Sequence, residues 1–81
     1  MSERHPARFS NEAGQTIRAM PAHVRDQLRS ALEKAETDPY AWPQGDRYDE
    51  DPTVRVVTTA DAIAHYVILP SHLLVFAALQ F

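Results

Sequence analysis

The residue pattern changes abruptly at Thr53, and this change restricts the chain to folds that combine helices with a sheet. Before Thr53, apolar residues recur at helical spacing. After it come three runs rich in β-branched and apolar residues, separated by two short connections. The chain has 81 residues, so we predict one domain spanning residues 1–81. Its 44% hydrophobic and 23% charged residues are typical of a folded protein rather than a disordered one.

The expected elements follow the order β-α-α-β-β-β. A short edge strand is predicted at 5–9, a helix at 11–20 with Ser10 as its N-cap, and a second helix that Asp38-Pro39 ends. Three strands at 53–59, 62–69 and 73–80 form an antiparallel meander. We therefore expect an α+β domain with both helices on one face of a mainly antiparallel four-stranded sheet. The second helix has one clean apolar stripe: Val24, Leu28, Ala31, Leu32 and Ala35.

The charge and composition of the chain indicate which kinds of partner it can bind. The net charge is −3: residues 1–34 hold six of the eight Lys and Arg residues, whereas residues 35–81 hold seven of the eleven Asp and Glu residues. Phosphate binding needs clustered cations, so nucleic acid is only weakly supported as a partner. The chain has no cysteine, no apolar N-terminal run and no stretch apolar enough to span a bilayer. We expect a cytoplasmic protein without a membrane partner.

The order of elements and three short segments resemble the RelE/ParE superfamily of bacterial toxins. Residues 54–57 (VRVV) are similar to the family's basic strand, 63–66 (IAHY) stand where Arg-apolar-apolar-Tyr is expected, and 73–78 (LLVFAA) are similar to its last strand. The resemblance implies a RelE-like fold, a place in a toxin–antitoxin module and an antitoxin peptide or protein as partner. A chain this short leaves apolar surface uncovered. A homodimer, in which a second copy covers that surface, is the alternative to an antitoxin partner.

The sequence departs from the RNA-cleaving members of that family. Ile63 stands where those members carry an arginine that helps hold the scissile phosphate, and the chain ends in Gln80-Phe81, where they carry Arg, His or Tyr. We therefore expect binding to a protein target, as ParE-like members bind gyrase, rather than mRNA cleavage. Two alternatives are a catalytically inert binding or regulatory module and a weak, metal-independent and ribosome-dependent mRNA endoribonuclease.

Arg55 and His65 are the candidate catalytic residues, since RNA cleavage needs a cation for the phosphorane charge and groups that move protons. By alternation Arg55 shares a face with Val57, and His65 shares one with Ile63. Because their strands should be adjacent, we predict that any residual activity needs both. The alternative interpretation is that Arg55 is a surface arginine and His65 a half-exposed histidine, neither with a functional role. Further candidates for contact with RNA or a target are Arg47, Trp42 and Gln80; Trp42 is equally typical of a residue that closes a core edge.

An acidic loop precedes the first strand of the meander. It holds Asp46, Asp49, Glu50 and Asp51. The resemblance implies that Glu50 or Asp49 could serve as a general base, and the alternative is a solvated turn. The carboxylates lack the alternation and the downstream Glu of a calcium loop, and no two histidines have metal-ligand spacing, so we expect no metal and no cofactor.

Overall fold

The computed structural model describes residues 4–45 and 51–81. Within them the elements are β1 (Ala7–Phe9), α1 (Asn11–Arg18), α2 (Ala22–Thr37), a short 3-10 turn η1 (Pro39–Ala41), β2 (Val54–Thr58), β3 (Ala62–Ile68) and β4 (Leu73–Gln80). The predicted order and the α+β class are confirmed. The first strand is shorter than expected, and the short turn η1 follows directly after α2.

Local chemistry fixes the ends of the helices. The Ser10 hydroxyl accepts a hydrogen bond from the N–H of Ala13 at 3.2 Å and caps α1, as the sequence predicted. The apolar stripe of α2 is buried at Val24, Leu28, Leu32 and Ala35. Asp38-Pro39 ends this helix, because a residue before proline is disfavoured in the helical region.

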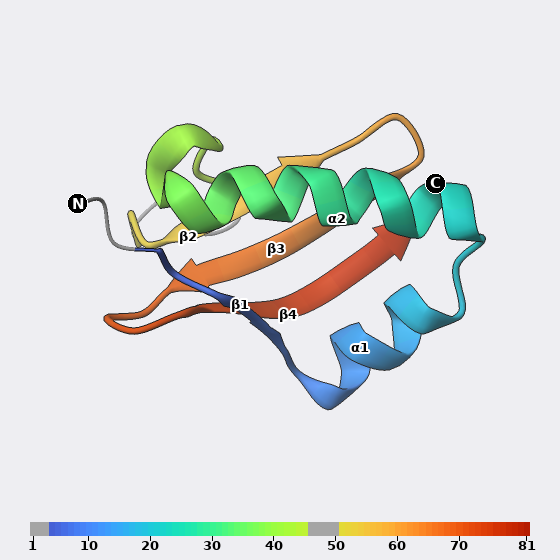
Figure 1. The fold of residues 1–81 in the computed structure, drawn as a ribbon, viewed down its shortest axis with the longest axis horizontal. Coiled ribbons are helices and arrows are strands. Elements are labelled where there is room, and N and C mark those ends of the chain that lie inside the picture. The colour runs from blue at the N-terminus through green and yellow to red at the C-terminus, as the bar shows by residue number, and fades with distance from the viewer. Residues whose placement is uncertain (1–3, 46–50) are drawn as a thin grey trace.

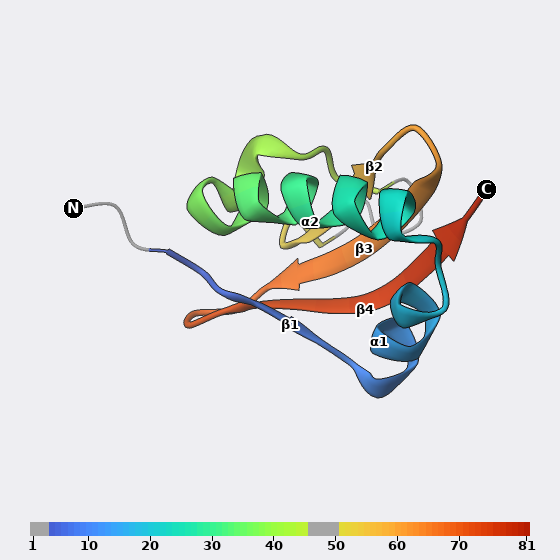
Figure 2. The same ribbon diagram turned by 45° about the vertical axis from the view of Figure 1, so that its right-hand side comes forward.

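The four strands form one sheet in the order β1-β4-β3-β2. β3 pairs antiparallel with both β2 and β4, whereas β1 is parallel to β4. Figures 1 and 2 show α2 lying across the sheet, with α1 beyond the end of β1. A bulge between β3 and β4 leaves Phe76 as the extra residue, since Tyr66 faces Val75 while His65 faces Ala77.

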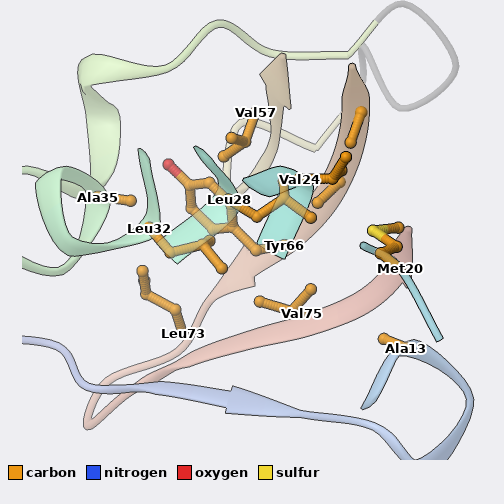
Figure 3. Packing of buried hydrophobic residues seen from close by; sticks show 12 residues of the cluster. Ala13, Met20, Val24, Leu28, Leu32, Ala35, Val57, Tyr66, Leu73 and Val75 are labelled. Carbon is orange, nitrogen blue, oxygen red and sulfur yellow. The ribbon is translucent and has the colours of Figure 1, made fainter. Parts of the chain in front are cut away.

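The core lies between the helices and one face of the sheet. Its largest fully buried side chain is Tyr66, which lies among Leu28, Leu32 and Val57 (Figure 3). α1 adds Ala13, and Met20 from the following turn joins the same cluster. Both helices therefore cover one face, as the pattern predicted.

The opposite face has no helix packed on it. The register directs Ile63, His65 and Val67 of β3 to this face, together with their partners Leu79, Ala77 and Leu74 in β4. All are partly or largely exposed, and Leu79 is 60% exposed. We call this surface the open face. Across the described ranges, no helix is long and apolar enough to cross a membrane.

Candidate functional site

Arg55 lies on the helix-covered side of β2. It is paired with Tyr66 in β3, so the two side chains share a face. The Arg55 Nε donates to the carbonyl of Pro52 at 2.9 Å, and Nη1 donates to the carbonyl of Trp42 at 3.3 Å. The guanidinium also lies 4.9 Å from the ring centroid of Tyr40. These contacts hold Tyr40, Trp42 and Pro52 against β2, so Arg55 has a structural role.

Trp42 follows η1 and is half-buried against the core. Its indole N–H donates to the carbonyl of Ala31 in α2 at 3.2 Å, and the Lys34 ammonium lies 5.6 Å from the ring centroid. This is the geometry of a residue that closes a core edge. The structure brings Trp42 and Arg55 together through the Trp42 carbonyl, in a small layer of cations and aromatic rings with Lys34 and Tyr40.

His65 lies on the open face, opposite Val56. Its ring centroid is 6.1 Å from that of Phe76, the bulged residue of β4. Gly45 packs over the same place: a β-carbon there would lie 2.6 Å from Val56 Cγ2 and 3.9 Å from His65 Nε2. The segment before β2 thus passes over the edge of the sheet and covers part of the ring. His65 is half-buried as a result.

The register separates the two catalytic candidates. Arg55 pairs with Tyr66 and His65 with Val56, so their side chains leave the sheet on opposite faces. The prediction that Arg55 and His65 act together is therefore wrong. The physical reason is that residues next to each other along β3 alternate between faces, and Arg55 lies directly across from the neighbour of His65.

The remaining candidates do not join either residue. Gln80 is exposed at the end of β4, across from Ala62, which is about 13 Å along β3 from the partner of Arg55. Arg47, Asp49 and Glu50 lie outside the described residues. Asp51 receives hydrogen bonds from the hydroxyl of Thr53 at 2.6 Å and from its N–H at 3.0 Å, which lower the pKa of this carboxyl and order the turn into β2.

Tyr66 carries a strongly shifted pKa. Burial raises the pKa of its phenol to about 12, and the charge of Arg55 opposes this shift in part. The hydroxyl donates to the carbonyl of Pro39 in η1. Tyr66 is therefore neutral and engaged at physiological pH, which suits a core residue and not a proton carrier. The described ranges contain no group of three or more His, Asp or Glu side chains that could hold a metal ion.

A groove of about 330 Å³ lies between β1, α1 and α2. Its apolar lining comes from Ala7, Phe9, Ile17, Leu28 and Leu32, and its charged lining from Arg4, Arg25, Arg29, Glu33 and Glu36. Arg25 and Arg29 stand outside the apolar stripe that the sequence predicted for α2. The signal that could have revealed the groove is the spacing of Arg25 and Arg29, one turn apart and adjacent to Leu28 and Leu32 of the stripe.

No protein-family model matches the sequence, and no curated relative was found. Among solved structures, the chain is similar to a double mutant of the E. coli toxin RelE in complex with an antitoxin RelBc peptide, with a TM-score of 0.78. The match covers 100% of this chain and 85% of that one, at 16% sequence identity. The fold is RelE-like. At this identity the likeness establishes the fold, which the resemblance to the family had implied.

Proposed function

We propose that the protein is the RelE-like component of a toxin–antitoxin module and acts by binding a protein target rather than by cleaving mRNA. The observation that carries this proposal is the likeness along the whole chain to RelE, a structure solved with an antitoxin peptide bound. By extension, we propose an antitoxin as the natural partner of this chain.

The placement of cations supports binding over cleavage. A phosphorane needs preorganised positive charge aimed at the reacting phosphate. Arg55 instead donates hydrogen bonds to the carbonyls of Pro52 and Trp42. Its side chain leaves the sheet on the face opposite that of His65. Among the described strand residues, Arg8 alone places a guanidinium on the open face, because it pairs with Leu74 of β4, which lies on that face. The rest of that strand surface is mainly apolar, which suits a protein surface better than a phosphate backbone.

The test is controlled expression in E. coli, with growth and mRNA integrity followed together. We expect growth inhibition without discrete cuts inside translated codons by primer extension, and relief of inhibition when the protein encoded by the adjacent gene is co-expressed. Codon-specific cuts would overturn the binding mechanism. Unchanged growth would overturn the toxin assignment and favour an inert binding module. Arg55→Ala is a poor diagnostic variant here, because it also frees the segment that Arg55 holds.

A further inference from the structure

We propose that two copies of the chain pair through their open faces, with Arg8 of each copy against Asp51 of the other. The pairing does not depend on the toxin assignment. It has a consequence for that assignment, because the paired form hides the face that a protein target would use.

The sheet is apolar on both faces, but the chain itself covers only one. None of the four strands contains Asp or Glu. At the end of the open face, Leu79 is 60% exposed and Phe81, next in the same alternation, is 67% exposed. Strands that are apolar on both sides are typical of sheets with both faces buried. A second sheet of the same kind is a cover that matches this surface.

The register of the sheet allows a two-fold contact. One row crosses all four strands of the open face: Arg8, Leu74, Val67 and Val54. A two-fold axis that runs parallel to the strands, between β3 and β4, reverses the order of this row in the second copy and keeps its height. Leu74 of each copy then lies over Val67 of the other, and Arg8 lies over Val54. Two sheets packed face to face in this aligned manner form a β-sandwich, with the helices outside.

The two ends of that row carry opposite charges. Arg8 is exposed, and within residues 4–45 and 51–81 no carboxylate forms an ion pair with it. Asp51 is also exposed and lies beside Val54, whose N–H donates to the Asp51 carbonyl at 3.1 Å. The two-fold contact therefore brings a guanidinium to a carboxylate at both ends. This complementarity favours a second copy over an apolar partner without such a carboxylate.

The size of the open face indicates a weak dimer. β4 has eight residues. At a rise of about 3.4 Å per residue and a strand spacing of about 4.8 Å, the part formed by β2, β3 and β4 has a flat area of roughly 400 Å². Side chains that stand on this plane add to its accessible area, and a standard interface buries about 800 Å² on each partner. We expect a monomer at the low micromolar concentrations of an unfolding experiment and a dimer at higher ones.

Sedimentation equilibrium of the folded full chain, from about 5 to 500 µM, measures the pairing. The wild type should change from monomer to dimer across this range. Leu79 pairs with Ile63, so the same axis places it inside the contact. Leu79→Glu buries a carboxylate there and should weaken pairing at least about tenfold. The matched control is Tyr40→Glu, at a side chain that is 57% exposed and lies beside Arg55 on the helix-covered side, and it should pair as the wild type does.

A mixing experiment tests the orientation of the two copies. Arg8→Glu and Asp51→Arg each put like charges at both ends of the row, so each should weaken self-pairing about tenfold. An equimolar mixture of the two variants should pair as strongly as the wild type, because both ends of the mixed dimer again join a guanidinium to a carboxylate.

Melting curves confirm that the variants fold. A wild type that stays monomeric, a Leu79→Glu variant that pairs like the wild type, or a mixture that pairs no better than its components would each overturn the proposal. If Asp51→Arg does not fold, the comparison of Leu79→Glu with Tyr40→Glu still decides. The readout is independent of growth: pairing without growth inhibition refutes the toxin assignment alone, and growth inhibition by a chain that stays monomeric refutes the dimer alone.

Discussion

The helix-covered face and the open face of the sheet are built from similar residues but buried to different extents. On the helix-covered side of β3, Ala62, Ala64 and Tyr66 are fully buried. On the open side, Ile63 and Val67 of the same strand are partly exposed, and more of the apolar surface lies at the end of β4. One strand therefore presents apolar side chains to two environments.

This difference separates side chains that hold the fold from side chains that are available for contact. A sheet face that meets water is usually polar, and the open face is not. Its side chains add little to the stability of the isolated chain while they remain exposed to water. An apolar face of this kind fits the partner-binding function proposed above.

The largest expected difference between the faces comes from removing one leucine from each. Leu28→Ala should lower the free energy of unfolding by about 2–4 kcal/mol, because it leaves a cavity in a filled core. Leu79→Ala on the open face should change it by less than about 0.5 kcal/mol. Urea denaturation of both variants measures the contrast. Equal losses would show that the open face is covered in the isolated chain, for instance by self-association.

A pair of glycines tests a place where the open face is closely covered, the contact of Gly45 with β2. Gly45→Ala should cost about 1–3 kcal/mol, since its β-carbon would lie 2.6 Å from Val56 Cγ2 and the segment would have to move. Neither glycine has a positive φ, so the effect is steric. Gly14→Ala in α1, where the nearest atoms are at 3.4 Å and 3.9 Å, should instead stabilise the protein by about 0.5–1 kcal/mol. Thermal melts that move both variants in the same direction would contradict this account of Gly45.

The strand pattern predicted which residues of β3 share a face, but it could not place Arg55 relative to His65. Alternation assigns faces within a strand, whereas the register between strands decides which faces coincide. That register depends on the turn before Ala62, where Thr59 and Asp61 both bond to Gln27 of α2. A slip of one residue would have put Arg55 and His65 on the same face. A contact between a turn and a helix far away in the chain leaves no periodic signal.

The groove could not be predicted from the sequence, for a related reason. The stripe predicted that Leu28 and Leu32 are buried, and they are. The sequence did not show that β1 would lie parallel to β4 and stand apart from α2 as one wall of a groove. A three-residue strand carries too little pattern to fix its partner, and its place depends on Glu36, a residue 29 positions away from Ala7.

A smaller effect is expected from the hydroxyl of Tyr66, at the centre of the covered face. Tyr66→Phe keeps the ring and removes the hydrogen bond to the Pro39 carbonyl, so it should cost about 1 kcal/mol. Tyr40→Phe, at an exposed ring, should cost nothing measurable. Spectrophotometric titration of the wild type should show one phenol ionising near pH 12, and this signal should be absent in Tyr66→Phe. A titration curve unchanged by Tyr66→Phe would contradict the burial of its hydroxyl.

The smallest expected effect is a pH dependence at the edge where β1 meets α2. Burial alone would raise the pKa of Glu36, but hydrogen bonds from Arg4 and from the N–H of Ala7 outweigh it and hold the pKa below its ordinary value of 4.5. A carboxyl with a depressed pKa contributes stability that is complete above its unfolded-state pKa and is lost as the pH falls through its folded-state value. Part of the stability should therefore disappear below about pH 4.5, and Glu36→Gln should lack that part while Glu33→Gln, a control on the same helix, retains it. The effect is small because the ion pair is partly in solvent.

Hydrogen exchange of the β1 amides at about pH 6 and pH 3, corrected for the intrinsic exchange rates, is the sensitive measurement. The protection of the Ala7 amide should fall as the pH is lowered in the wild type. In Glu36→Gln it should be low at both pH values. Equal protection in both proteins at the higher pH would mean that Glu36 does not hold this strand and that its pairing with β4 is sufficient.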